Sequence, residues 1–174
     1  MDNKKRFLDM HSSVLDSEFN LFCEEADSHS LEFIEDCERK TILTSVVNTQ
    51  IEAISTMYEL QKSALKAIEL TPQEAVEIVS QKMKEDDVFS AQGVDGSDCY
   101  RFMNNELKMN RKVALAAYEN NSSVARHFPK ALQEQLKGKD IGKTLKSMAL
   151  SDDLDKMFYK SSKKQSLSGK MTIW

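Results

Sequence analysis

Cysteine and histidine are the side chains of this chain best suited to catalysis or metal binding, and they are widely spaced. His11, His29 and His127 lie far apart, and none is three or four residues from another histidine or a cysteine, so the local zinc-binding spacings are absent. Cys99 and His127 would form a thiol nucleophile and its base only if the fold brought them together; the alternative is a buried structural cysteine. We therefore expect no catalytic residues, no metal site and no cofactor.

Two further segments invite comparison with ligand-binding loops but do not match them. The sequence GKDIGKT at residues 138–144 has three residues between its glycines, whereas a phosphate-binding loop has four and follows a strand. We expect a helix end at Gly138 and a turn before a helix at Thr144. A calcium loop with Gly96 at its turn would place an alanine and a phenylalanine at two ligand positions, and neither side chain binds calcium.

The composition of the 174 residues is ordinary for a soluble protein with one modest core, since 40% are hydrophobic and 30% are charged. No apolar run approaches the roughly 18 residues that span a bilayer, and the N-terminus lacks the apolar region of an export signal. The three cysteines are odd in number and widely separated, which favours reduced thiols over disulfides. We expect a cytoplasmic protein without a membrane span.

Charge is divided unevenly along the chain, although the formal net charge is only −4. Residues 1–100 hold 9 Lys and Arg against 21 Asp and Glu, and residues 101–174 hold 15 against 7, which gives −12 and +8. Residues 7–38 contain 10 acids and no Lys or Arg. Either the acidic and basic halves face each other within the fold or in a homo-oligomer, or the N-terminal part binds a basic partner or the tail binds an anionic surface.

The first seventy residues predict long helices. Glycine and proline are absent from residues 1–71, so nothing breaks helix propensity there. Apolar residues at steps of three and four predict a helix over 9–26, and short polar side chains at 27–30 predict a turn in which Ser30 caps the next helix. That second helix is expected over 31–70.

The helix expected over 31–70 carries two adjacent apolar stripes that repeat at steps of four and three. They are Val47, Ile51, Ile54, Tyr58, Gln61, Leu65 and Ile68, and Val46, Gln50, Ala53, Met57, Leu60, Ala64 and Ala67. Two stripes make a face wide enough for more than one neighbouring helix, so we expect a bundle rather than a two-stranded coiled coil. Gln50 and Gln61 either hydrogen-bond across the seam or lie at a solvated edge.

Short helices are expected after residue 71. Thr71, Pro72 and Glu74 have the types and spacing of an N-cap, a first helical residue and the partner in a capping box. That helix is expected to end at the acids of 85–87, before a loop over 88–98. The other helices are expected over 98–107, 111–120 after an Asn110 cap, 123–127, 129–137, 144–150, and 152–160 after a Ser151 cap.

The sequence LKMNRKVALAAYENN, residues 107–121, is similar to the helical repeat of domain of unknown function 4116, and the similarity extends over about residues 102–136. The matching positions are Leu107, Lys108, Asn110, Arg111, Val113, Leu115, Ala116, Ala117 and Asn121, whereas Ser122 stands where the family tends to have glycine. The resemblance implies a paired-helix packing unit of a bacterial or viral protein, without known catalytic residues. Such units normally occur in arrays, and the long N-terminal helices would replace the missing neighbours.

The C-terminal residues differ in kind from the rest. Residues 161–174 are rich in serine and lysine and end with Met171, Ile173 and Trp174, which predicts a flexible tail with an apolar end. These three residues either bind in a groove of a partner, serve as an export signal, or fold back onto the chain's own helices. The sequence thus predicts an all-α helical bundle: one domain over 1–160, with long helices over 1–70 and short packed helices over 71–160, followed by the tail.

The absence of a catalytic set favours a non-enzymatic helical protein that binds another protein, as an adaptor or a secreted bacterial effector. One alternative is an acidic secretion chaperone for a basic or unfolded client, and another is an enzyme whose site is assembled from scattered residues. The expected partner is a protein, with a homo-oligomer as one option. Specific nucleic-acid binding is not expected, because the basic residues lack interleaved aromatics. The expected location is the cytoplasm, or outside it if a specialised secretion system exports the chain.

Overall fold

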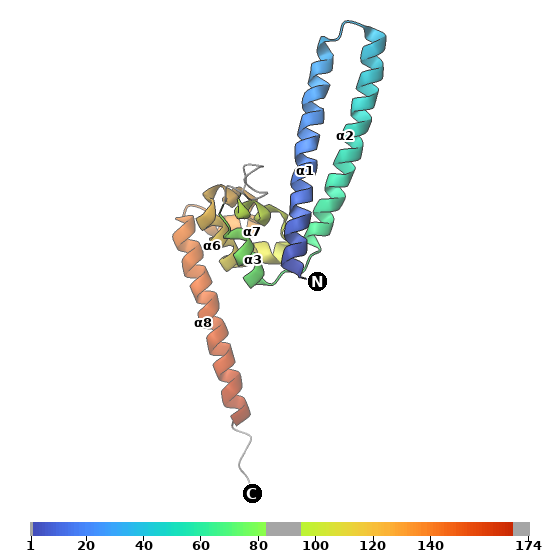
Figure 1. Cartoon of the computed structure of the whole chain (residues 1–174). Coiled ribbons are helices and arrows are strands. Elements are labelled where there is room, and N and C mark those ends of the chain that lie inside the picture. Colours follow the sequence, from blue (N-terminus) through green and yellow to red (C-terminus); the bar gives the residue numbers. More distant parts are fainter. Residues whose placement is uncertain (1, 83–94, 169–174) are drawn as a thin grey trace.

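The computed structural model describes residues 2–82 and 95–168, with side chains described as far as Tyr159 in the last helix. Every regular element in these ranges is helical, which confirms the all-α prediction. A compact body lies between two projections, a long two-helix hairpin and a single C-terminal helix, and the two projections leave the body in opposite directions (Figure 1).

Helices α1 (Asn3–Ser30) and α2 (Cys37–Lys66) form the antiparallel hairpin, joined at its far end by the 3-10 helix η1 (Leu31–Phe33). Neither long helix contains glycine or proline, so each continues for many turns. The first apolar stripe of α2 faces α1, and at the seam between them the Ser17 hydroxyl donates to Gln61 Oε1 at 2.9 Å. Gln61 therefore hydrogen-bonds across the seam.

The predicted turn at residues 27–30 is wrong, because α1 includes these residues and the chain turns at 31–36. The Ser30 hydroxyl donates to the carbonyl oxygen of Ala26 at 3.3 Å, so this short polar side chain is accommodated inside the helix instead of ending it. Asp36 caps α2 in its place, because its side chain accepts hydrogen bonds from two backbone N–H groups of the first turn. The second helix is consequently shorter than expected at both ends.

Helix α3 (Pro72–Val79) begins the body, and its predicted capping box is confirmed. The Thr71 hydroxyl accepts from the Glu74 N–H at 3.2 Å, and Glu74 Oε2 accepts from the Thr71 N–H at 2.8 Å. The helix ends well before the acids at which its end was expected, and those acids lie outside the described residues.

Five short helices follow within the described part of the body: η2 (Gly96–Phe102), α5 (Asn105–Met109), α6 (Arg111–Asn120), η3 (Ser122–His127) and α7 (Lys130–Leu136). The side chains of Asn104, Asn110 and Asn121 accept hydrogen bonds from backbone N–H groups at the starts of α5, α6 and η3. The range of α6 and its Asn110 cap are as predicted. The single helix expected over 98–107 is instead two, because Asn104 starts a new one.

The body closes where η2 meets the end of α3. The Gly96 N–H donates to the carbonyl oxygen of Gln81 at 3.0 Å. A Cβ at Gly96 would lie 2.3 Å from the carbonyl oxygen of Ile78, so only glycine allows this close approach. Asn120, at the end of α6, donates from Nδ2 to the carbonyl oxygens of Val79 and Gln81. These contacts hold α3, η2 and α6 around one core.

The hydrophobic core runs from the base of the hairpin into the body. The base contributes Phe7, Val14 and Leu65. The body contributes fully buried side chains from its helices and from the start of the last helix, among them Ile78, Val79, Tyr100, Val113, Leu132 and Leu145. Burial of each large apolar side chain contributes roughly 1.5 to 3 kcal/mol, so this packing joins the hairpin base and the body into one folded unit.

Helix α8 (Ile141–Ser168) is continuous, whereas the sequence predicted two helices with a break at Ser151. The two aspartates that follow Ser151 form ion pairs with Arg111 and Lys112 of α6, so they hold the helix against the body instead of beginning a new one. Residues 161–168, predicted to belong to a flexible tail, are also helical.

Candidate interaction surface

The hairpin exposes large apolar side chains on both of its helices. On α1 they are Phe19 and Phe22, and on α2 they are Ile42, Val46, Met57 and Leu60, each more than half exposed. Phe33, at the turn, is 86% exposed. Single exposed apolar residues are normal on a protein, but rows of them at helical spacing are typical of a surface that another element covers.

The α2 stripe is defined as Ile42, Val46, Met57 and Leu60. The last three belong to the second of the two apolar stripes seen in the sequence, and Ile42 lies one helical turn before it. We expected more than one neighbouring helix to cover the two stripes. In the structure α1 covers the first stripe, and the four residues of the α2 stripe remain between 51% and 66% exposed. The sequence therefore indicated the need for a further neighbour, which the described part of this chain does not supply.

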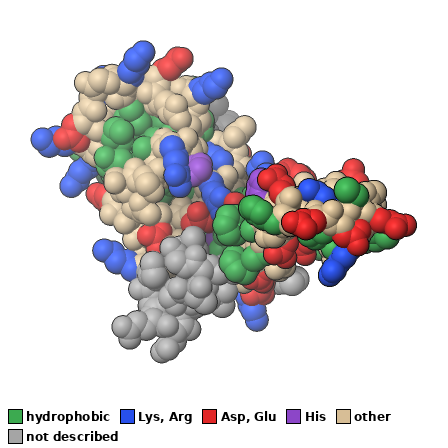
Figure 2. Space-filling view, turned by 90° about the horizontal axis from the view of Figure 1, so that it is seen from above, with side chains coloured by type: hydrophobic (Ala, Val, Ile, Leu, Met, Phe, Trp, Pro, Cys, Tyr) green, Lys and Arg blue, Asp and Glu red, His purple; other side chains and the backbone are tan. Residues whose placement is uncertain are grey.

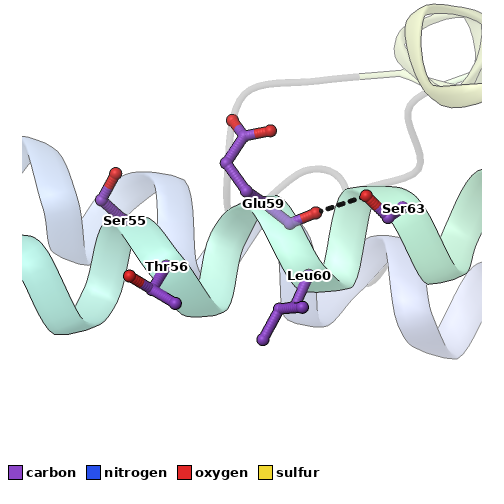
Figure 3. Close-up of a pocket in the computed structure, with 5 residues that line it drawn as sticks. All are labelled: Ser55, Thr56, Glu59, Leu60 and Ser63. Carbon is purple, nitrogen blue, oxygen red and sulfur yellow. Dashed lines mark hydrogen bonds between the residues drawn. The ribbon is translucent and has the colours of Figure 1, made fainter.

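The α1 stripe, defined as Phe19, Phe22 and Ala26, lies on the opposite side of the hairpin. A step of one residue turns a helix by about 100°. The α1 stripe follows the seam residues of α1 by one position, and the α2 stripe precedes those of α2 by one position. Because the helices are antiparallel, these offsets place the stripes on opposite sides. Figure 3 shows the same division on α2, where Leu60 and Glu59 point to opposite sides of the helix.

Acidic side chains border both stripes. Residues 7–30 of α1 include six acids and no Lys or Arg. By the same helical offsets, Glu24 and Asp27 of α1 lie on the side of the α2 stripe, and Glu52 and Glu59 of α2 lie on the side of the α1 stripe. Figure 2, which looks onto the end of the hairpin, shows acidic side chains gathered there among apolar ones. This surface suits a partner whose apolar residues are flanked by lysine or arginine.

A polar cluster fastens the base of the hairpin to the body. Arg101 of η2 donates from Nη1 to Glu18 Oε1 at 3.0 Å and from Nε to Asp98 Oδ2 at 3.1 Å. His11 of α1 is fully buried, with its Nε2 3.3 Å from Asp98 Oδ2. The Tyr58 hydroxyl of α2 donates to Glu18 Oε1 at 3.4 Å. Side chains of both hairpin helices therefore meet those of η2 at one place.

The cluster also shifts the ionisation of its members. Burial opposes the charge of Asp98, but the hydrogen bond from His11 and the positive charge of Arg101 outweigh it, so the pKa of Asp98 is lowered. Burial likewise opposes the charge of Arg101, yet its hydrogen bonds to Glu18 and the negative charge of Asp98 raise its pKa. Burial and the negative charge of Glu18 raise the pKa of Tyr58. Charged Asp98 and Arg101 with protonated Tyr58 are the forms that hold the hairpin in place.

Helix α8 exposes another apolar row, which begins where the helix still lies against the body and continues beyond it. Its first turns pack on α6 and bury Leu145. The α8 stripe, defined by its exposure and its steps of three and four residues, consists of Leu150, Leu154, Met157 and Phe158, which are 47% to 70% exposed. The sequence predicted two short helices here with a break at Ser151, so it did not indicate one continuous stripe.

The three residues that the sequence suggested for partner binding, Met171, Ile173 and Trp174, lie outside the described residues. Their role stays a prediction. In the segment GKDIGKT, Gly138 follows the end of α7 with a φ of 72°, as expected for a helix end. Helix α8 begins at Ile141, before the start expected at Thr144.

Cys99, considered above as a nucleophile, is buried in the core of the body. Burial and the negative charge of Asp98 raise the pKa of the Cys99 thiol well above its ordinary value, so the thiol stays protonated. His127 lies in η3, where Arg126 Nε donates to its Nε2 at 3.0 Å. Burial and the positive charge of Arg126 lower the pKa of His127. Because Cys99 is buried and its thiol stays protonated, it has the properties of a structural core cysteine.

Two surface hollows are each lined by one helix. The first, with a volume of about 380 Å³, lies on the outer side of α2 and is lined by Ser55, Thr56, Glu59, Leu60 and Ser63 (Figure 3). The second, of about 430 Å³, lies along α7 and is lined by Lys130, Gln133, Glu134 and Lys137. A single helix cannot enclose a small ligand, so neither hollow has the form of a typical small-molecule site.

Within residues 2–82 and 95–168, no three His, Cys, Asp or Glu side chains are grouped closely enough to hold a metal ion. Over the part of the chain that the structure describes, no helix combines the length and the apolar character of a membrane span. Comparison of the chain with protein-family models, curated proteins and solved structures finds no match. The similarity of residues 102–136 to the repeat of domain of unknown function 4116 therefore stays a prediction.

Proposed function

We propose that this chain is a non-enzymatic helical protein that binds another protein through the exposed apolar rows of its hairpin. The observation that carries the proposal is the exposure of six large apolar side chains in two rows on an arm that the body does not cover. Aromatic and long apolar side chains dominate the binding energy of protein interfaces once they are buried. Each contributes roughly 1.5 to 3 kcal/mol when it leaves water.

The base of the hairpin supports this role. Arg101 bonds to Glu18 of α1 and to Asp98 of η2, and Phe7 and Leu65 are buried in the common core. An arm fixed at its base presents its outer rows with little loss of conformational entropy on binding. The body then serves as the support and the hairpin as the contact surface of an adaptor or effector.

The acidic borders of the stripes suggest the chemistry of the partner. Glu24, Asp27, Glu52 and Glu59 would attract a segment whose apolar residues are flanked by Lys or Arg, over a screening length of about 8 to 10 Å at ordinary salt. The same acidity supports a second candidate, a secretion chaperone for a basic client. Hydrogen exchange of the bound client distinguishes the two, because a chaperone holds its client unfolded and an adaptor binds a folded partner.

The cellular location of the protein is also part of this proposal. Cys23 and Cys37 are free and exposed on the hairpin, which suits the reducing cytoplasm. Export by a specialised secretion system is the alternative, and it depends on the C-terminal residues Met171, Ile173 and Trp174.

A pull-down from native lysate tests the proposal. The full chain is compared with the double variant Phe22→Ser, Met57→Ser and with the control Asn20→Ser, Asn48→Ser, which changes two exposed polar residues on the same helices. We expect a specific partner to be lost with the first variant and kept with the control. A chain ending at Lys160 separates the tail from the hairpin. Identical partners for the wild-type chain and the Phe22→Ser, Met57→Ser variant would contradict the proposal.

A further inference from the structure

The hairpin and α8 carry complementary apolar rows that lie far apart within one copy of the chain. Figure 1 shows that the two projections leave the body in opposite directions. The α2 stripe and the α8 stripe are both rows of four large side chains, and each row is largely exposed.

The hairpin and the C-terminal end of α8 have opposite net charge in the sequence. Residues 7–30 of α1 include six acids and no base, and Glu24 and Asp27 among them lie on the side of the α2 stripe, whereas residues 154–168 of α8 include four lysines and one acid. The two aspartates that precede this part of α8 are already in ion pairs with Arg111 and Lys112. The outer part of α8 is therefore the basic part, and opposite charge steers two such rows together and selects against like-charged partners.

The part of α8 beyond the body is long enough to cover most of the α2 stripe. Ile42 and Leu60, the ends of that stripe, are 18 residues apart, and Leu154 and Ser168, which follow the ion pairs of α8 with α6, are 14 residues apart. These segments of α-helix rise roughly 27 Å and roughly 21 Å.

We infer that α8 of one copy of this chain packs on the α2 stripe of a second copy. The contact joins the α8 end of one molecule to the hairpin end of the next, so it is heterologous and continues from copy to copy. The inference rests on the proposed function, because it uses the hairpin as a binding surface and names the occupant of one side. The α1 stripe, on the other side, stays accessible to a different protein.

Sedimentation velocity of the full chain tests this contact with three single variants at exposed positions. Met57→Lys places a base in the α2 stripe, Leu154→Glu places an acid in the α8 stripe, and Phe22→Lys changes the α1 stripe as a matched control. We expect the wild-type chain to form oligomers that grow with concentration. Met57→Lys and Leu154→Glu should each weaken self-association by about tenfold or more, and Phe22→Lys should leave it unchanged.

Mixing Met57→Lys with Leu154→Glu gives the sharper result. The Met57→Lys chain keeps an intact α8, and the Leu154→Glu chain keeps an intact α2 stripe, so one contact can form between them. We expect complexes that contain both variants at concentrations at which each variant alone stays monomeric. High salt should dissociate them, since the screening length falls from about 10 Å at 0.1 M to about 3 Å at 1 M.

Two results would overturn the inference. One is a wild-type chain that stays monomeric at every concentration. The other is self-association that Met57→Lys abolishes and Leu154→Glu leaves unchanged, because hairpins would then contact each other. Circular dichroism and urea unfolding show whether each variant is folded. The proposed function would still stand after either result if the single variant Phe22→Ser, which changes only the α1 stripe, no longer captured from native lysate a protein other than this chain that the wild-type chain captures.

Discussion

The body and the outer hairpin are both built from helices, but they use their apolar side chains differently. In the body, short helices with asparagine caps pack on several neighbours, and Val113 and Leu132 are fully buried. In the outer hairpin, two long helices share one seam, and Phe22 and Ile42 are 67% and 61% exposed. Apolar residues in the body therefore stabilise the fold, whereas those on the hairpin remain accessible to another surface.

The largest expected effect comes from the core of the body. Leu132→Ala should lower the free energy of unfolding by about 2 to 5 kcal/mol, because it removes a fully buried side chain and leaves a cavity. Urea unfolding followed by circular dichroism measures the loss, with Leu60→Ala of the hairpin as the matched control. Equal losses for the two leucines would show that the outer hairpin is packed like the body.

A smaller effect is expected where the two regions join. Arg101→Met should lower the free energy of unfolding by about 1 to 3 kcal/mol, because Glu18 and Asp98 lose their charged donor while partly buried. Hydrogen exchange should accelerate in α1 near Glu18 more than in α6. Lys143→Met, which changes an exposed ion pair with Asp140, is the control and should change stability little. Similar exchange in Arg101→Met and wild-type protein would contradict this role of the cluster.

The same cluster predicts a dependence on pH. The pKa of Asp98 is lowered in the folded state, so its contribution to stability is present above its unfolded pKa of about 3.9 and is lost as the pH falls through the lower folded pKa. Asp98→Asn should therefore lose less stability on acidification below about pH 4 than the wild-type chain. Thermal unfolding over this range measures the difference, with Asp155→Asn on exposed α8 as the control. Parallel curves for wild type and Asp98→Asn would refute the linkage.

The smallest effect on stability is expected from the hairpin stripes themselves. Phe22→Ser and Leu60→Ser should change the free energy of unfolding by no more than about 0.5 kcal/mol, because both side chains are mostly exposed. Urea unfolding checks this value. A loss of several kcal/mol from either substitution would mean that the stripe is already part of the folded core.

Local signals in the sequence predicted local structure well. The capping box of Thr71 and Glu74 and the Asn110 cap depend only on neighbouring residues, and both are present. The hairpin turn was misplaced because Ser30 hydrogen-bonds back into its own helix. Whether Ser30 bonds back into its own helix or caps the next one depends on the conformation of its side chain, which the residue type alone does not determine.

The candidate surface was only half predictable. The two stripes of α2 could be recognised in the sequence from their repeat at steps of four and three residues. Which of the two stripes α1 covers depends on how each helix is rotated about its own axis, and the repeat does not determine that rotation. The cluster of Glu18, Asp98 and Arg101 was invisible, because these residues are far apart in the chain and meet only in the folded protein. The α8 stripe was concealed by the break expected at Ser151, which the contacts of α8 with α6 prevent.

Site-directed photo-crosslinking in intact cells tests most directly whether the exposed apolar rows of the hairpin form a binding surface. A photoreactive side chain is placed at Phe22 or Met57, and at exposed Glu134 on α7 of the body as the control. We predict discrete crosslinked products from the two hairpin positions, to a second copy of the chain or to another protein, and none of them from position 134. The absence of discrete products from both hairpin positions, or the same products from all three positions, would contradict the account.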